Sequence, residues 1–105
     1  MGASIATAGI VCAVGIAAIG LVGVGAAAAE SQRASGIADA AALAAAETLA
    51  GFSAGEPCER SRRVAAAQGA DVTSCEIDGL VATIAIRTRF GAIAVTAVAR
   101  AGPPL

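Results

Sequence analysis

A glycine-containing stretch at residues 16–30, IAAIGLVGVGAAAAE, has a spacing that is typical of a ligand-binding loop. Its Gly23-x-Gly25-x-x-Ala28 matches the fingerprint that cradles a dinucleotide pyrophosphate, provided that a strand precedes it and strand–helix–strand units follow. The residues after it are instead dominated by alanine, which favours a helix. Glu47, near the distance expected for a ribose-binding acid, falls inside that helix. We therefore interpret the stretch as part of one continuous helix and expect no cofactor.

The three cysteines are the other side chains with reactive chemistry. Cys12 lies in an uncharged run and is interpreted as a small apolar residue. Cys58 and Cys75 have no C-x-x-C spacing and the sequence has no histidine, which argues against a metal site or a catalytic thiol. Asp39 and Glu47 are interpreted as solvated residues of a helix face. We identify no catalytic, cofactor-binding or metal-binding residue, and predict a protein that is not an enzyme and has no small-molecule substrate.

The distribution of charge indicates a membrane segment. Residues 1–29 carry no charged side chain, and all 7 basic and 8 acidic residues follow, from Glu30 onward. A helix needs roughly 20 apolar residues to cross a hydrocarbon core of about 30 Å, so residues 1–29 are predicted to be a transmembrane helix. The alternative is a signal sequence cleaved near Ala27–Ala29, which would release a small secreted effector or binding module. A net charge of −1 argues against a nucleic-acid partner.

Small residues recur one helical turn apart along this run. In lipid, such positions allow neighbouring helices to approach closely, because van der Waals contact replaces the absent hydrophobic driving force. The partners expected here are membrane lipid and other helices. The predicted helix-packing positions are Gly9 with Ala13, Gly23 with Ala27, and Gly25 with Ala29.

Residues 30–51 are predicted to continue the same helix outside the membrane. Glu30 and Arg33 are spaced to form an ion pair on one face. Gly36 is a weak point in this helix and Gly51 is its expected stop. A second face carries small and apolar residues, namely Ile37, Ala41, Ala44 and Thr48.

Residues 52–105 are predicted to form a small α+β head. A short helix is expected to begin at Pro57, with Glu56 and Glu59 at the positive end of its dipole. Gly69 is its expected end. A third strand, AIAVTAVAR, is expected after Gly91. Its partly buried residues are expected to be Ile93, Val95 and Val98. The fold class is therefore α+β, with a long N-terminal helix, a short helix and a small antiparallel sheet of two or three strands.

Residues 72–90 are predicted to form a β-hairpin around Asp78-Gly79, a favoured dipeptide for a type I′ turn. That turn would pair Ile77 with Leu80, Cys75 with Ala82, and Thr73 with Ile84. The resulting apolar face comprises Thr73, Cys75, Ile77, Leu80, Ala82, Ile84 and Ile86. The opposite, polar face comprises Ser74, Glu76, Asp78, Thr83, Arg87 and Arg89.

This register predicts a disulfide between Cys58 and Cys75. Cys75 would lie on the apolar face of the hairpin, where the short helix with Cys58 is expected to pack. The bond would close a loop of about 17 residues and contribute on the order of 3 kcal/mol in the chain-entropy model. A disulfide also indicates an oxidising compartment outside the cytoplasm.

Taken together, the alanine-rich helix ASGIADAAALAAAETLAG, the block PCERSRRVAAAQGADVTSCEIDG and the terminal ARAGP resemble the small TadE-like proteins of actinobacteria. The resemblance covers nearly the whole chain, and the block from Cys58 to Cys75 is its most specific part. It implies a pilin-like or minor-pilin-like subunit of a tight-adherence (Flp) pilus or a related type II/IV secretion apparatus. The implied partners are other pilin-like or TadE/TadF-like subunits, and the implied location is the cell membrane, with a single pass and an extracellular head.

One position departs from the pattern of type IV pilin precursors, which have a Glu five residues after a Gly cleavage site. If Gly2 were that glycine, the fifth position would be Thr7. We expect either a true start upstream of Met1 or a protein that is not processed like a major pilin. The positive-inside rule does not by itself support an external C-terminus, because Arg33 follows the span and no basic residue precedes it.

Overall fold

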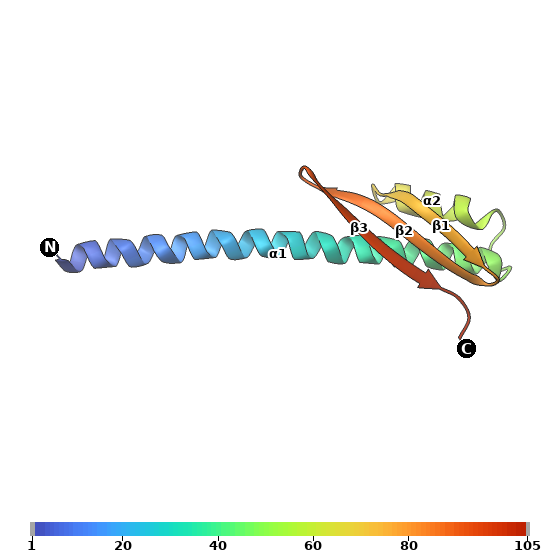
Figure 1. The fold of residues 1–105 in the computed structure, drawn as a ribbon, viewed down its shortest axis with the longest axis horizontal. Helices are drawn as coiled ribbons and strands as arrows, with labels where there is room; N and C mark the ends of the chain where they lie inside the picture. Colours follow the sequence, from blue (N-terminus) through green and yellow to red (C-terminus); the bar gives the residue numbers. More distant parts are fainter. Residues whose placement is uncertain (1, 105) are drawn as a thin grey trace.

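The computed structural model describes residues 2–104 and has an α+β fold. A long helix, α1 (Gly2–Leu49), runs the length of the molecule, which extends over 75 × 29 × 17 Å (Figure 1). A short helix and a three-stranded sheet cover only the C-terminal part of α1 and form the head (Figure 1). The long helix, short helix and small antiparallel sheet that the sequence predicted are therefore confirmed.

Helix α1 is continuous through Gly36, the expected weak point. It ends in a hydrogen-bonding pattern that satisfies its last carbonyl groups. Gly51 has φ +87°, its N–H donates to the carbonyl of Thr48 at 3.2 Å, and the N–H of Phe52 donates to the carbonyl of Glu47 at 2.9 Å. Only a residue without a Cβ adopts this backbone conformation readily, so Gly51 stops the helix as predicted.

Helix α2 (Pro57–Ala67) follows after a short loop and has the predicted ends. The side chain of Glu56 caps its N-terminus, and Pro57 occupies the first turn, where a missing N–H costs nothing. At the other end, Gly69 has φ +76° and donates to the carbonyl of Ala66 at 3.0 Å. The N–H of Ala70 donates to the carbonyl of Ala65 at 2.9 Å, which completes the same terminal pattern as in α1.

The sheet has the order β1-β2-β3 and is antiparallel throughout. Its strands are β1 (Asp71–Asp78), β2 (Val81–Phe90) and β3 (Ile93–Ala101). Each pair of strands is joined by a two-residue turn that begins with a glycine at positive φ, Gly79 at +63° and Gly91 at +61°. The sheet packs with one face against α1, so the molecule has two layers in the head and a single bare helix beyond it (Figure 1).

The predicted register of the first hairpin is wrong by two residues. Asp78 pairs with Val81, and the turn residues are Gly79 and Leu80. Because Gly79 has positive φ and Leu80 does not, the turn matches type II′ and Asp78 stays in the strand. Cys75 consequently pairs with Ile84 instead of Ala82, and Ile77 pairs with Ala82. A shift of two residues keeps every side chain on its face, so Cys75 still faces α2.

A second correction concerns Thr73, which was expected on the apolar face. A β-bulge at this residue leaves Val72 paired with Ile86 and Ser74 paired with Ala85. The extra residue reverses the alternation at the start of β1. Val72 therefore packs against the core, whereas Thr73 is exposed and donates its hydroxyl to the carbonyl of Ala85 at 3.3 Å.

The predicted burial of the third strand is correct at one residue of three. Val95 is partly buried, but Ile93 is 66% exposed and Val98 is 67% exposed. Val98 lies on the solvent face because the inward positions of β3 are the odd-numbered ones, from Val95 to Ala101. Leu80 and Ile77 are also exposed, at 51% and 41%, since they lie at the turn end of the first hairpin.

The core lies between the C-terminal part of α1, helix α2 and the inner face of the sheet. Alanines of α1 let the neighbouring elements approach closely, and the isoleucines of β2 fill the remaining space. The predicted inward residues Ile37, Ala41 and Ala44 are buried and Thr48 is partly buried. The fully buried core residues of α1 are Ala34, Ile37, Ala38, Ala41, Ala42 and Ala45, and those of the sheet are Ala82, Ile84 and Ile86.

Candidate functional site

The apolar N-terminal part of α1 is the largest feature that the fold leaves without a partner. Every residue from 2 to 29 is exposed, and the large apolar side chains from Ile5 to Val24 are 63–75% exposed. By length and composition this helix could cross a membrane, and a signal sequence near an N-terminus would meet the same criteria. We call residues 2–29 the stalk.

The stalk contains the complete Gly23-x-Gly25-x-x-Ala28 stretch as regular helix. A dinucleotide site would need a strand and a tight turn at these glycines. Neither glycine has positive φ, and residues 2–49 form one helix, so the stretch does not form a nucleotide-binding loop. The helical interpretation of this stretch is therefore correct.

The predicted helix-packing residues all lie on the exposed stalk. A Cβ added to Gly9, Gly23 or Gly25 would meet no atom of the described residues within 4 Å. These glycines are thus not required by packing inside this chain. The full predicted set, Gly9, Ala13, Gly23, Ala27, Gly25 and Ala29, is available for contact with lipid or another helix.

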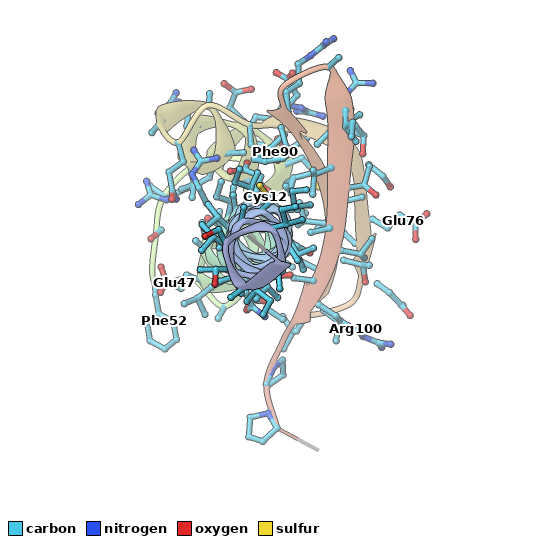
Figure 2. The ribbon with its side chains drawn as sticks, turned by 90° about the vertical axis from the view of Figure 1, so that its left-hand side faces the viewer. Cys12, Glu47, Phe52, Glu76, Phe90 and Arg100 are labelled. Atoms are coloured by element: carbon cyan, nitrogen blue, oxygen red, sulfur yellow. A yellow bond between two sulfur atoms is a disulfide. The ribbon has the colours of Figure 1, made fainter. Side chains whose placement is uncertain are left out.

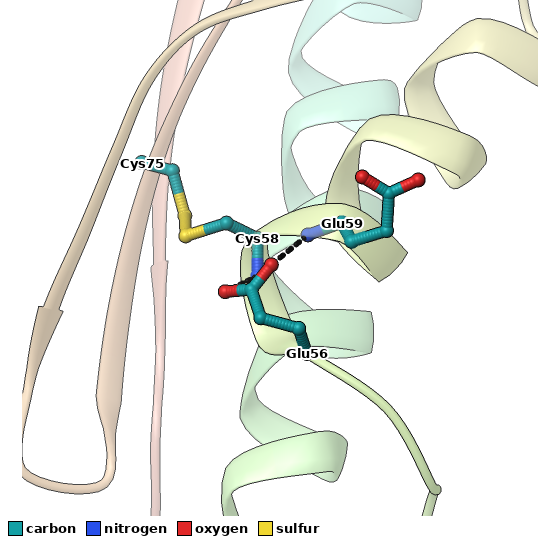
Figure 3. The surroundings of a disulfide bond; sticks show 4 residues. All are labelled: Glu56, Cys58, Glu59 and Cys75. Atoms are coloured by element: carbon teal, nitrogen blue, oxygen red, sulfur yellow. Dashed lines mark hydrogen bonds between the residues drawn. A yellow bond between two sulfur atoms is a disulfide. The ribbon is translucent and has the colours of Figure 1, made fainter.

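The head contains the predicted disulfide between Cys58 in the first turn of α2 and Cys75 in β1 (Figure 3). The Cα atoms of the two cysteines are 6.0 Å apart and 17 residues apart in sequence. The bond joins the helical layer to the edge strand of the sheet. Loss of loop-closure entropy in the unfolded chain gives it a stabilising effect of about 3 kcal/mol.

Glu56 lies next to this disulfide and caps α2. Its carboxylate accepts the N–H of Cys58 at 3.0 Å and the N–H of Glu59 at 2.6 Å (Figure 3). These two backbone hydrogen bonds, together with the charge of Arg62, hold the pKa of Glu56 below its ordinary value. The carboxylate is therefore a structural cap, and its charge also complements the positive end of the helix dipole.

Arg33 links the two helices at the point where the head begins. One guanidinium nitrogen donates to Glu30 Oε1 at 3.1 Å, which confirms the predicted pair. The other donates to the backbone carbonyl of Gln68, the C-cap of α2. A cation at this position satisfies a terminal carbonyl and complements the negative end of the dipole. Sequence spacing predicted the pair with Glu30, but the contact with Gln68 links residues 35 apart and had no local signal.

An apolar groove lies at the opposite end of the head from the stalk. It has a volume of about 300 Å³ and lies between the end of α1, the first hairpin turn and the C-terminal tail. The tail approaches the turn closely at Gly102, where an added Cβ would lie 2.8 Å from Val81 Cγ2. The groove is lined mainly by Leu43, Ala46, Phe52, Leu80, Pro103 and Pro104, and sequence reasoning did not identify it.

The described residues contain no arrangement with evident catalytic chemistry. Across residues 2–104 there is no group of three or more His, Cys, Asp or Glu side chains that could hold a metal ion. Asp39 and Glu47 are exposed residues of α1, and Cys12 is an exposed free thiol on the stalk (Figure 2). The arrangement instead combines an apolar helix with a covalently braced head.

Comparison of the chain with protein-family models, with curated proteins and with solved structures gives no match.

Proposed function

We propose that this chain is a non-enzymatic, membrane-anchored, pilin-like subunit of a Flp-type pilus or an associated secretion apparatus. The observation that carries the proposal is the division of α1 into two parts. Residues 2–29 are exposed and apolar, whereas the buried residues between Ala34 and Ala45 form part of the core of the head. Apolar surface of this extent is unfavourable in water, so the stalk needs lipid or the helices of other subunits around it.

The disulfide supports a location of the head outside the cytoplasm. Bonds of this kind form and persist in oxidising compartments and are rare in the cytosol. The block from Cys58 to Cys75 is also the most specific part of the resemblance to TadE-like proteins. A single-pass membrane protein with an extracellular head agrees with both arguments, and its expected partners are lipid and other pilin-like or TadE/TadF-like subunits.

The small residues of the stalk are the proposed contact with other helices. A Gly23→Leu/Gly25→Leu variant would place two bulky side chains where close approach is expected. We expect this variant to lose co-purification of tagged and untagged copies, or of the chain with the pilus fraction. Val22→Leu, at another exposed position of the same turn, is the control and should retain it. Equal co-purification of both variants would argue against packing through these glycines.

Cell fractionation tests the proposal as a whole. We expect the chain in the membrane fraction and in material sheared from the cell surface, with Cys58 and Cys75 oxidised. Thiol alkylation followed by mass spectrometry reads the redox state directly. Recovery of the chain in the cytosol with both thiols free would overturn the proposal.

The alternative is a secreted effector or binding module released by cleavage near Ala27–Ala29. One observation favours it: the first buried residue of α1 is Ala34, so such a cleavage would leave the entire core of the head in the product. Mass spectrometry of the exported protein separates the two functions. A mature N-terminus at or near Glu30 indicates release, and an N-terminus at Met1, Gly2 or Ala3 indicates an anchor.

A further inference from the structure

The second hairpin of the sheet projects beyond the rest of the head. The last pair of β1 with β2 joins Asp71 to Arg87, but β2 continues to Phe90 and β3 begins at Ile93. Three more residues on each strand thus form a two-stranded ribbon, which extends about 10 Å past the three-stranded sheet at roughly 3.3 Å per residue. In Figure 1 this ribbon lies to one side of α1 and reaches further towards the N-terminal end of α1 than α2 does.

The position of the ribbon along α1 places its tip beside the end of the stalk. The C-cap of α2, Gln68, contacts Arg33, and β1 begins three residues later at Asp71. The ribbon continues from that level towards the N-terminal end of α1 (Figure 1). Arg33 is only four residues past Ala29, the last residue of the uncharged stalk, and a helix rises about 1.5 Å per residue.

The tip has the composition of a membrane-interface contact. Its turn is Gly91-Ala92, and the flanking apolar residues Phe90 and Ile93 are 37% and 66% exposed. Figure 2, which looks along α1 from the stalk end, shows Phe90 on the α1 side of the sheet, whereas Glu76 and Arg100 point away from it. Apolar residues that enter the headgroup region, with basic residues behind them, are typical of interfacial anchors.

Two arginines lie directly behind the tip. Arg87 and Arg89 are exposed residues of β2 on the solvent face; Arg87 pairs with Asp71 of β1, whereas residues 88–99 around Arg89 contain no acidic side chain. Basic side chains close to an anionic lipid surface are attracted to it. The hairpin therefore has an apolar end on the α1 side of the sheet, with the two arginines behind it on the opposite face.

The length of the stalk brings this tip to the level of the lipid headgroups. As a helix, residues 2–29 are about 42 Å long, whereas the hydrocarbon core is about 30 Å thick. The last turns of the stalk consequently reach the interface, and the tip lies beside them. We propose that residues 90–93 insert into the headgroup region of the bilayer, with Arg87 and Arg89 against anionic lipid, as a second membrane contact of the head. This inference rests on the proposed membrane anchor.

The sequence has no tryptophan or tyrosine, so a single introduced tryptophan is the sole indole reporter. The experiment uses the full chain in vesicles of phosphatidylcholine and phosphatidylglycerol, with and without brominated acyl chains. We expect the emission of Phe90→Trp, and of Ile93→Trp as a second reporter, to shift to the blue and to lose intensity with brominated lipid. Phe52→Trp is the matched control, since Phe52 is 84% exposed at the far end of the head, and should respond to aqueous iodide instead.

A third reporter separates this inference from the anchor itself. Leu21→Trp lies in the stalk, and brominated lipid should quench it strongly if the stalk is in the bilayer. Quenching of Leu21→Trp without quenching of Phe90→Trp and Ile93→Trp would overturn the hairpin contact and leave the anchor intact. No quenching at position 21 would overturn the anchor and the inference together. A blue shift at position 90 that brominated lipid does not quench would indicate that a second copy covers the tip, which also overturns the proposal.

The arginines give an independent test of lipid charge. In vesicles with phosphatidylglycerol, an Arg87→Gln/Arg89→Gln change made in the Phe90→Trp background should reduce both the blue shift and the quenching. In vesicles of phosphatidylcholine alone it should change neither. An identical effect in both lipids would contradict the role of anionic headgroups. Disulfide formation, measured by alkylation, verifies that each variant has folded.

Discussion

At the scale of single residues, two polar side chains stabilise the ends of α2 in opposite ways. Glu56 caps the N-terminus with a carboxylate that accepts two backbone N–H groups. Arg33, from another helix, donates to the carbonyl of Gln68 at the C-terminus. Each charge has the sign that the dipole of the nearby helix end favours, so both ends of this eleven-residue helix are satisfied.

The lowered pKa of Glu56 predicts a pH-dependent contribution to stability. Because the native pKa lies below the ordinary value of 4.5, the contribution is fully present above that value and is lost as the pH falls through the native pKa. Glu56→Gln should therefore lower Tm by a few degrees at neutral pH, and the difference from the wild type should shrink in acid. Glu56→Asp, a preferred capping residue, is the control and should retain the pH dependence. A difference that is independent of pH would contradict the charged cap.

Removal of the Arg33 side chain should loosen the junction between the two helices. We expect Arg33→Gln to lower the free energy of unfolding by about 1 kcal/mol, because a cation and a donor leave the end of α2. Arg63→Gln is the matched control. Arg63 pairs with Glu59 at 3.8 Å with both side chains mostly exposed, so its loss should change stability by less than about 0.5 kcal/mol. Urea unfolding followed by circular dichroism measures both; equal effects would exclude a special role for Arg33.

At the scale of elements, the head part of α1 has a buried face and an exposed face, and residues of the two faces lie within about one and a half turns of each other. Ala41 is fully buried, whereas Gly36 is exposed and an added Cβ there would meet no described atom within 4 Å. Ala41→Leu should destabilise the head by about 1–3 kcal/mol through overpacking. Gly36→Ala should stabilise it by about 0.5–1 kcal/mol through helix propensity. Unfolding midpoints that move in the same direction for both variants would contradict this assignment of faces.

The elements that sequence analysis predicted best are those with a local chemical signal. Gly51 and Gly69 each end a helix because a residue without a Cβ adopts positive φ easily, and Pro57 starts a helix because it has no N–H to lose. The disulfide was predictable for a related reason. A hairpin register shifted by two residues preserves the facing of Cys75, so the error in the turn did not affect the pairing with Cys58.

The features that were missed have no such local signal. Asp78-Gly79 is compatible with two turns, one formed by both residues and one in which Gly79 is the first turn residue, as observed. The bulge at Thr73 has no distinctive residue type. In β3, valine and alanine occur on both faces, so alternation does not reveal that Val98 faces solvent. The contact of Arg33 with Gln68 depends on how α2 folds back along α1, which sequence spacing does not encode.

At the scale of the whole molecule, the stalk and the head are structurally separate. Among the described residues before Glu30, from position 2 to 29, none is even partly buried, and the core begins at Ala34. A fragment of residues 30–105 should therefore fold, form the disulfide between Cys58 and Cys75, and unfold with a free energy within about 1 kcal/mol of the full chain in detergent. Circular dichroism, alkylation and urea unfolding test this. An unfolded fragment would show that the stalk contributes to the head.

Because α1 is continuous from the stalk to the head, the rotation of the head about the long axis is coupled to the rotation of the stalk. Because the helix has no hinge, the direction in which the hairpin points around the axis of α1 is determined by the number of stalk residues that precede the head. One alanine inserted between Ala28 and Ala29 should rotate the head by about 100° and raise it by about 1.5 Å. Seven inserted alanines should restore the original rotation of the head to within about 20° while raising the head by about 10 Å. An assembly that requires a particular rotation of the head about α1 would tolerate the seven-residue insertion and reject the one-residue insertion. An assembly that requires a particular distance of the head from the membrane would tolerate the one-residue insertion and reject the seven-residue insertion.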